Sequence, residues 1–191
     1  MRKLFFDTFL TTIVFIFCLQ PAFAGSPASS EYTKANKMFA QGKFTDAIVV
    51  YQGILVSPSN NVPQADIHTR IGDCYFRLGN YQKAGDAYRV ALTKQKPADR
   101  APTQYWIGFC SFLSGRDAEA VNEFLKIPEL YPSSGMWMTT AYYWAGRASE
   151  RMGKKEQAAE FYRKAGGKGA SSQERYALKK AEGVNKASGV Q

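Results

Sequence analysis

Residues 65–92, ADIHTRIGDCYFRLGNYQKAGDAYRVAL, decide the fold of this chain. This stretch carries a small residue at Gly72, a second glycine at Gly79, an alanine at Ala84 and an aromatic residue at Tyr88. The same order of residue types returns around Gly42, Gly115 and Gly153, every 36 to 38 residues: small residues (Ala35, Gly72, Gly108, Gly146), glycines (Gly42, Gly79, Gly115, Gly153), alanines (Ala47, Ala84, Ala120, Ala158) and aromatics (Tyr51, Tyr88, Phe124, Tyr162). An internal repeat of this length predicts a stack of similar units.

Each position of the repeat has a mechanical reason. A glycine tolerates the left-handed conformation that ends a helix before the chain reverses. Small residues let two helices cross closely, and an aromatic residue one turn after the alanine fills the space on the same face of the second helix. One such hairpin cannot bury its apolar face alone, so neighbouring hairpins must stack.

This pattern resembles the tetratricopeptide repeat over roughly residues 30–166. Residues 65–92 match best, residues 105–132 and 142–165 match well, and residues 32–55 are weaker in their leading helix. The resemblance implies an all-α, right-handed solenoid of about four helical hairpins. We expect helices over residues 30–41, 44–57, 63–78, 81–95, 99–114, 117–127, 133–152 and 155–165, grouped as repeats at about 30–58, 63–97, 99–132 and 133–166.

Two features modify this scheme. Pro128 falls inside the expected sixth helix and should kink or end it. Ser171 and Glu174 form a candidate capping box for a C-terminal capping helix at about 171–182, so that the solenoid as a whole would span residues 30–182. Residues 25–29 and 183–191 are expected to be a disordered linker and tail.

The first 24 residues have the order of a secretory signal peptide: Arg2 and Lys3, an apolar run over 9–19, and Ala-Phe-Ala at 22–24. We expect cleavage after Ala24 and a periplasmic location; the alternative is an uncleaved anchor. Residues 151–191 hold ten Lys or Arg and four Glu, a net charge of +6. This end could bind an anionic polymer or a membrane surface, or serve only as a solvated face. Export argues against nucleic acid.

Motifs for chemistry are scarce. His68 is the single histidine, without a partnered nucleophile, and the sequence has no zinc-spaced Cys/His cluster and no phosphate-binding loop. We therefore expect no enzymatic activity, no cofactor and no metal. Cys74 and Cys110 occupy equivalent positions in successive repeats, about 8–10 Å apart if the helices stack, which favours two buried thiols over a disulfide.

In the tetratricopeptide family, the first helices of successive hairpins line a concave groove that usually holds a peptide or partner segment. The resemblance places these partner-binding residues in the groove: Phe39, Phe76, Arg77, Tyr105, Phe109, Phe112, Tyr143 and Arg147. Clustered aromatic side chains are typical of binding hot spots. The alternative is that some of them pack between repeats.

The chain is also similar to helical envelope proteins: soluble lytic transglycosylases around residues 142–148, the C-terminal domain of Tol-Pal coordinator proteins, and outer-membrane assembly lipoproteins. It lacks the catalytic domain, the coiled coil and the lipobox of these groups. The resemblance implies a periplasmic scaffold or adaptor for a cell-envelope protein. The alternative is a polymer- or membrane-surface-binding module that uses the basic C-terminal end.

Overall fold

The computed structural model describes residues 27–57, 61–167 and 172–188. In these residues it contains nine α-helices, one short 3-10 helix and no strand. The elements are α1 (Pro27–Ala40), α2 (Phe44–Leu55), α3 (Gln64–Arg77), α4 (Tyr81–Lys94), η1 (Pro97–Asp99), α5 (Arg100–Leu113), α6 (Asp117–Leu130), α7 (Gly135–Arg151), α8 (Lys155–Gly166) and α9 (Ser172–Ser188).

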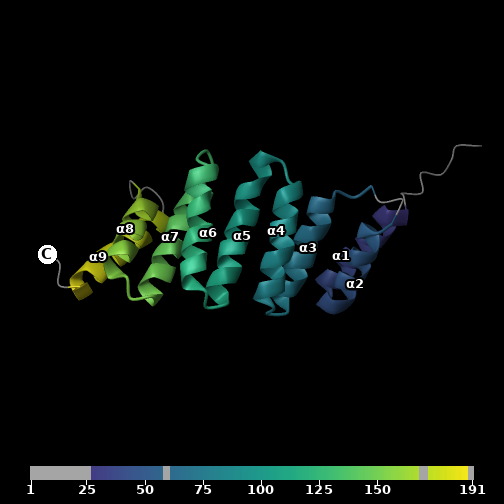
Figure 1. Cartoon of the computed structure of the whole chain (residues 1–191), viewed down its shortest axis with the longest axis horizontal. Coiled ribbons are helices and arrows are strands. Elements are labelled where there is room, and N and C mark those ends of the chain that lie inside the picture. The colour runs from purple at the N-terminus through teal and green to yellow at the C-terminus, as the bar shows by residue number, and fades with distance from the viewer. Residues whose placement is uncertain (1–26, 58–60, 168–171, 189–191) are drawn as a thin grey trace, which may run out of the picture.

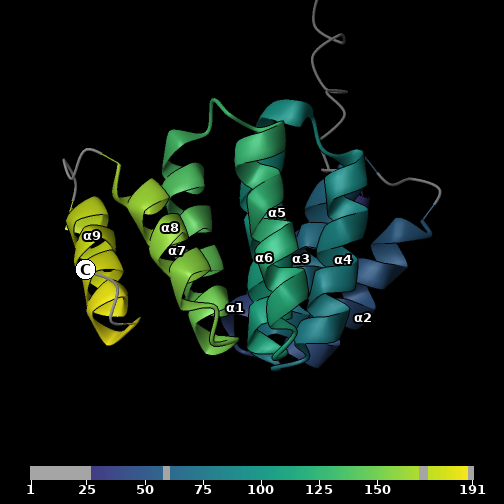
Figure 2. The ribbon, with the colours of Figure 1, turned by 60° about the vertical axis from the view of Figure 1, so that its left-hand side comes forward.

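The helices stand side by side in chain order, so that each one packs against the next (Figures 1 and 2). They form four hairpins, which are α1 with α2, α3 with α4, α5 with α6, and α7 with α8. Helix α9 packs against α8 and closes the end of the stack. Helices α5 and α7, the first helices of the third and fourth hairpins, also touch each other directly. The predicted all-α hairpin solenoid is confirmed.

Glycine ends the first helix of every hairpin. Gly42, Gly79, Gly115 and Gly153 have φ between 72° and 76°, a left-handed conformation that other residues rarely adopt. The amide after each glycine donates to a carbonyl five residues earlier, as Asn80 does to Tyr75 at 2.9 Å. This bond closes the helix end and fixes the chain reversal.

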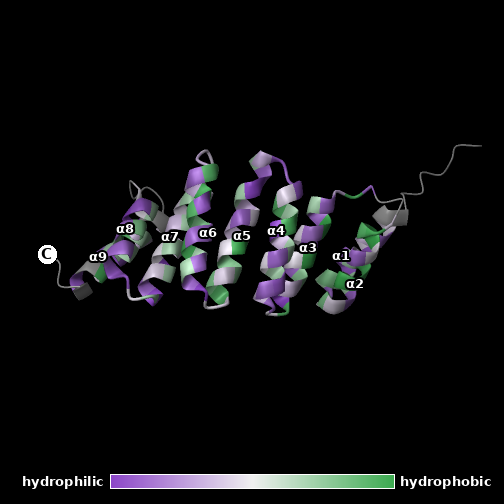
Figure 3. Cartoon of the chain, viewed as in Figure 1, coloured by the Kyte–Doolittle hydropathy of each residue, from purple (hydrophilic) through white to green (hydrophobic). Residues whose placement is uncertain are grey.

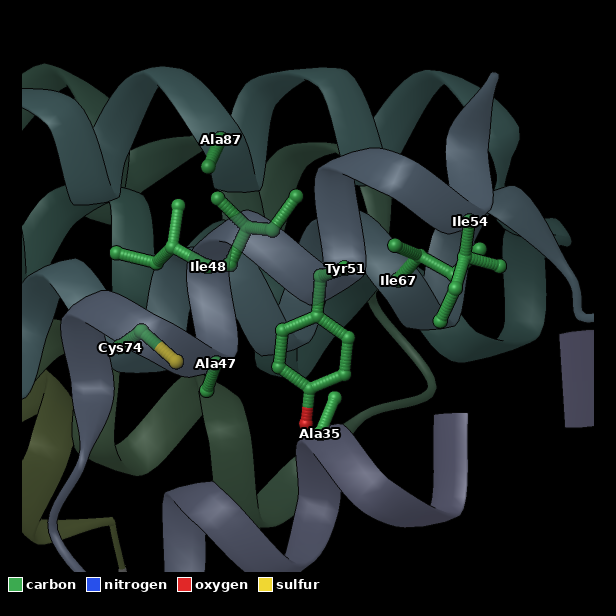
Figure 4. Packing of buried hydrophobic residues seen from close by; sticks show 9 residues of the cluster. Ala35, Ala47, Ile48, Tyr51, Ile54, Ile67, Cys74 and Ala87 are labelled. Carbon is green, nitrogen blue, oxygen red and sulfur yellow. The ribbon is translucent and has the colours of Figure 1, made fainter. Parts of the chain in front are cut away.

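The small residue and the aromatic residue of each repeat occupy one packing site. A Cβ atom added at Gly108 would lie 2.8 Å from the Phe124 ring, and one added at Gly146 would lie 2.7 Å from the Tyr162 ring. In the first repeat, where Ala35 takes the small position, the Tyr51 ring lies beside it in the core (Figure 4). The repeat pattern therefore encodes how closely the two helices of a hairpin approach.

The helices are amphipathic, and hydrophobic and hydrophilic residues alternate along each of them (Figure 3). The apolar residues form a chain of small clusters between neighbouring helices. Such a core has no single centre, and each repeat relies on its neighbours for burial.

Pro128 was expected to kink or end the sixth helix at about residue 127; the helix instead extends to Leu130, two residues beyond Pro128. Pro128 lacks the amide donor of an ordinary helical residue, but the amide of Tyr131 still donates to the Ile127 carbonyl at 2.9 Å at the end of the helix.

The expected disordered ends were partly wrong as well. Residues 27–29 are helical, since a proline is tolerated in the first turn of a helix and α1 begins at Pro27. Residues 183–188 continue α9, where Val184 is buried against α8. The expected signal peptide at 1–24 and the capping residue Ser171 lie outside the described residues.

In the part of the chain that the structure describes, no helix combines the length and apolar character needed to cross a membrane.

Candidate partner-binding groove

Helices α3, α5 and α7 carry a band of aromatic side chains on their shared side. We call this band the aromatic strip; it consists of Phe76, Tyr105, Trp106, Phe109, Tyr143 and Trp144, all half-buried. The sequence predicted four of these residues as groove residues, and the structure brings the four together.

The rings of the strip connect one repeat to the next. The Phe76 ring centroid lies 5.2 Å from Trp106 and 6.1 Å from Phe109. Phe109 in turn lies 4.7 Å from Trp144 in an edge-to-face arrangement, and Trp144 lies 5.7 Å from Tyr143. Aromatic pairs at these separations contribute about 0.5–1.5 kcal/mol each beyond simple burial. The strip is therefore a preorganised surface that spans three repeats.

Phe112 is not a groove residue, contrary to the prediction. It is 7% exposed and belongs to a core cluster that α5 forms with α6, α7 and α8. The Arg151 guanidinium covers its ring at 4.0 Å and donates to its carbonyl. The neighbouring residue Leu113 is exposed instead, at 36%.

The repeat register accounts for the exposure of Leu113 but not for the burial of Phe112. Arg77 and Arg151 each follow the small residue of their repeat by five positions, and both are exposed. Leu113 stands at the same position after Gly108, whereas Phe112 follows Gly108 by four residues, just as the strip residue Phe76 follows Gly72. The register therefore identifies Leu113 as exposed, but it does not show that Phe112, unlike Phe76, is buried beneath Arg151.

Trp106 and Trp144 were also missed from the sequence. Trp106 precedes Phe109 by three residues, which places both on one face of α5. Trp144 follows Tyr143 and reaches back to Phe109 and Phe112, at 4.7 Å and 5.1 Å. The helical spacing of these tryptophans to the predicted groove residues is visible in the sequence. A tryptophan next to a repeat position is, however, equally consistent with a buried core residue.

Phe39 belongs to a separate set of contacts in the first repeat. Its ring packs edge-on against Phe44 at 5.3 Å, and the Arg70 guanidinium lies 6.0 Å from the ring centre. It is half-buried, so it extends the groove toward α1 without joining the ring contacts of the strip that run through Phe76.

Two positions that form a polar side-chain pair in the first and second repeats hold apolar residues in the third repeat. The hydroxyl of Tyr51 donates to Asn36 at 2.7 Å, and that of Tyr88 donates to Asp73 at 2.8 Å. In the third repeat these two positions hold Phe124 and Phe109, which cannot form this hydrogen bond; Phe124 is buried in the core, and Phe109 places an apolar ring in the middle of the strip. This substitution gives the groove its apolar centre.

Electrostatics differ between the centre and the edges of the groove. Burial raises the pKa of Asp73 above its ordinary value, although hydrogen bonds from Tyr88 and Arg70 oppose the shift. Arg77 is exposed at the end of α3, and Arg147 lies 5.7 Å from the Trp144 ring centre with its guanidinium 3.5 Å from the Tyr143 hydroxyl. Arg147 therefore borders the strip, and Arg77 directly follows the strip residue Phe76 in the chain.

The remaining candidates for chemistry are not members of the strip. His68 is half-buried, and burial, followed by the charge of Lys94, lowers its pKa. Cys74 and Cys110 are buried free thiols; burial raises the pKa of Cys74 to about 11 and that of Cys110 to about 12. Among the described residues, no group of His, Cys, Asp and Glu side chains is placed to hold a metal ion.

Comparison with known proteins agrees with this geometry. The human protein O-mannosyl-transferase TMTC2 is 30% identical over 115 residues, 60% of this chain but only 13% of that protein. The apo form of RapI superposes with a TM-score of 0.74 at 14% identity, over 85% of this chain and 49% of RapI. MamA superposes at 0.57 with 20% identity, over 82% of this chain and 97% of MamA.

These likenesses to solved structures concern the fold alone. The match to the human protein spans about an eighth of its length, so the activity in its name belongs to that protein. Family models described as tetratricopeptide repeat match residues 32–102, 103–134 and 139–165 of this chain. The chain therefore belongs to the tetratricopeptide repeat family.

Proposed function

We propose that this protein is a non-enzymatic scaffold that holds a protein partner across the aromatic strip. The tetratricopeptide fold is that of a protein–protein interaction scaffold. The observation that carries the proposal is the strip itself: linked rings from α3, α5 and α7 remain partly open to solvent, and exposed Leu113 follows Phe109 by one helical turn on α5. Aromatic anchors of this kind supply most of the binding energy in protein interfaces.

The chemistry of the groove defines the partner segment. An apolar centre around Phe109 favours aliphatic or aromatic side chains, and arginines at 77 and 147 favour negative charge at the borders. An extended or helical segment with apolar anchors and some acidic residues fits this surface.

The proposed location is the periplasm, with cleavage after Ala24, and the proposed role is that of an adaptor in a cell-envelope assembly or maintenance complex. The support is the order of basic, apolar and small residues over 1–24. Sequencing the N-terminus of the mature protein tests it: a start at Gly25 supports export, whereas an intact Met1 contradicts it.

Groove binding is tested with a matched pair of substitutions. Leu113→Gln places a polar group at the apolar centre, and Val90→Gln makes the same kind of change on α4, at a residue of similar exposure (41% against 36%). We expect Leu113→Gln to reduce recovery of the co-purifying partner about tenfold, since an apolar anchor contributes about 1.5–3 kcal/mol when buried. Quantitative mass spectrometry of affinity-purified complexes measures this.

Val90→Gln serves as the control and should leave recovery unchanged, and circular dichroism should show both variants to be folded. Equal recovery with both variants would remove the groove as the binding surface.

A further inference from the structure

The C-terminal end of the groove contains a pocket that the aromatic strip does not use. Its volume is about 430 Å³, and it lies where α7, the start of α8 and α9 meet. It is lined by Glu150, Lys155, Tyr176, Lys179, Lys180, Gly183 and Val184.

Positive charge dominates this pocket. Three lysines face one carboxylate, a net charge of 3 − 1 = +2. The carboxylate is already satisfied: Glu150 accepts hydrogen bonds from the Tyr162 hydroxyl at 2.7 Å and from Lys180 Nζ at 3.0 Å. Burial alone would raise the pKa of Glu150, but these two bonds hold it below its ordinary value. The exposed ammonium of Lys179 therefore adds positive charge that Glu150 does not cancel.

The pocket continues the aromatic strip. Tyr176 lines the pocket, is 54% exposed, and lies 5.9 Å from the Tyr143 ring, which is the last ring of the strip. Glu150 follows Tyr143 by seven residues on α7, which is two helical turns along the same face. A segment lying on the strip and running toward α9 would thus reach the lysines directly.

We propose that this pocket binds an acidic segment of the same protein partner whose apolar side chains lie on the strip; the proposal rests on the groove function above. The rings of the strip come from α3, α5 and α7, with Arg77 alone at the α3 end, whereas three lysines of α8 and α9 gather in the pocket at the other end. A bound segment would therefore have one preferred direction, with its apolar anchors over α5 and its carboxylates against Lys155, Lys179 and Lys180.

A charge reversal with a control on the same helix tests this proposal. Lys179→Glu reverses a charge in the pocket, and Lys186→Glu makes the same change in total charge at an exposed residue of α9 that does not line it. The probes are two fluorescein-labelled peptides that share leucine and phenylalanine anchors; one ends in a run of glutamates and the other in a run of glutamines. Fluorescence anisotropy with the purified full-length protein gives the affinities.

We expect the glutamate peptide to bind more tightly than the glutamine peptide, and Lys179→Glu to weaken the glutamate peptide about fivefold. Lys186→Glu should have little effect, and added salt should reduce the difference between the two peptides. Equal affinities for both peptides, or equal effects of the two lysine variants, would overturn the proposal.

Two further arms separate this proposal from its alternatives. If phosphatidylglycerol vesicles bind with the same dependence on Lys179, the pocket is a general anion surface and the proposal fails. If Leu113→Gln leaves both peptides unaffected while Lys179→Glu still weakens the glutamate peptide, the groove proposal fails but the acidic pocket stands.

Discussion

Replacing Gly72 with alanine tests the packing rule of the repeat most sharply. A Cβ atom at this position would lie 2.5, 2.7 and 3.0 Å from three carbons of the Tyr88 ring. Carbon atoms in contact prefer about 3.5–4.0 Å, so α3 and α4 must separate or the ring must move. The ring has little freedom, because Tyr88 is 1% exposed and its hydroxyl is held by Asp73 at 2.8 Å.

The size of the effect follows from comparison with a second glycine. Overpacking a core costs about 1–3 kcal/mol, whereas alanine in place of glycine inside a helix gains about 1 kcal/mol. Gly85, inside α4, would place its Cβ no closer than 3.6 Å to Arg89 and Cys110. Gly85→Ala therefore receives the gain without the clash, and Gly72→Ala should be less stable than Gly85→Ala by about 1–3 kcal/mol.

Urea unfolding followed by far-UV circular dichroism measures both free energies of unfolding. Because both substitutions are the same chemical change within helices, their difference isolates the contact with Tyr88. Equal stabilities of the two variants would refute the idea that the small residue sets the approach of the two helices.

Three further predictions concern single side chains. Burial raises the pKa of Asp73, so this group stabilises the native state at acid pH and its contribution is lost as the pH rises through the folded-state pKa. Asp73→Asn should therefore gain stability relative to the native protein between acid and neutral pH in urea titrations. A difference in unfolding free energy between the two proteins that stays constant with pH would contradict this. Cys74 and Cys110 should react with iodoacetamide only upon unfolding, because burial raises the pKa of both thiols, to about 11 and about 12; rapid labelling of the folded protein would show them to be accessible. Arg151→Ala should destabilise the protein by about 1–2 kcal/mol in thermal melts, because it removes an ion pair to Asp117 and the cover over the Phe112 ring; an unchanged melting temperature would show that these contacts contribute nothing.

The architecture was readable from the sequence because its determinants are local and repeated. Position 79 requires a residue that tolerates the left-handed conformation at the end of α3, and position 72 requires a small residue beside the Tyr88 ring. Four copies of this pattern therefore predict four hairpins. The end of α6 was not readable in the same way, since Pro128 removes one hydrogen bond but does not prevent one further turn of helix.

The groove was readable only in part, because exposure depends on the neighbouring repeat. Phe112 and Leu113 are both apolar and adjacent, and only the packing of Arg151 and α6 decides that Phe112 is buried and Leu113 is exposed. The basic pocket depends likewise on how α9 docks beside α7, which lies beyond the repeat pattern. The identity of the partner is not encoded in packing at all.

The central claim is that a partner lies across the aromatic strip, and in-cell photocrosslinking tests it most directly. A photoreactive amino acid in place of Leu113, and the same amino acid in place of Val90, probe two residues of similar exposure on α5 and α4. We predict that position 113 captures a specific protein through a segment with apolar and acidic residues, while position 90 does not. Capture of the same protein from both positions, or from position 90 alone, would contradict the account.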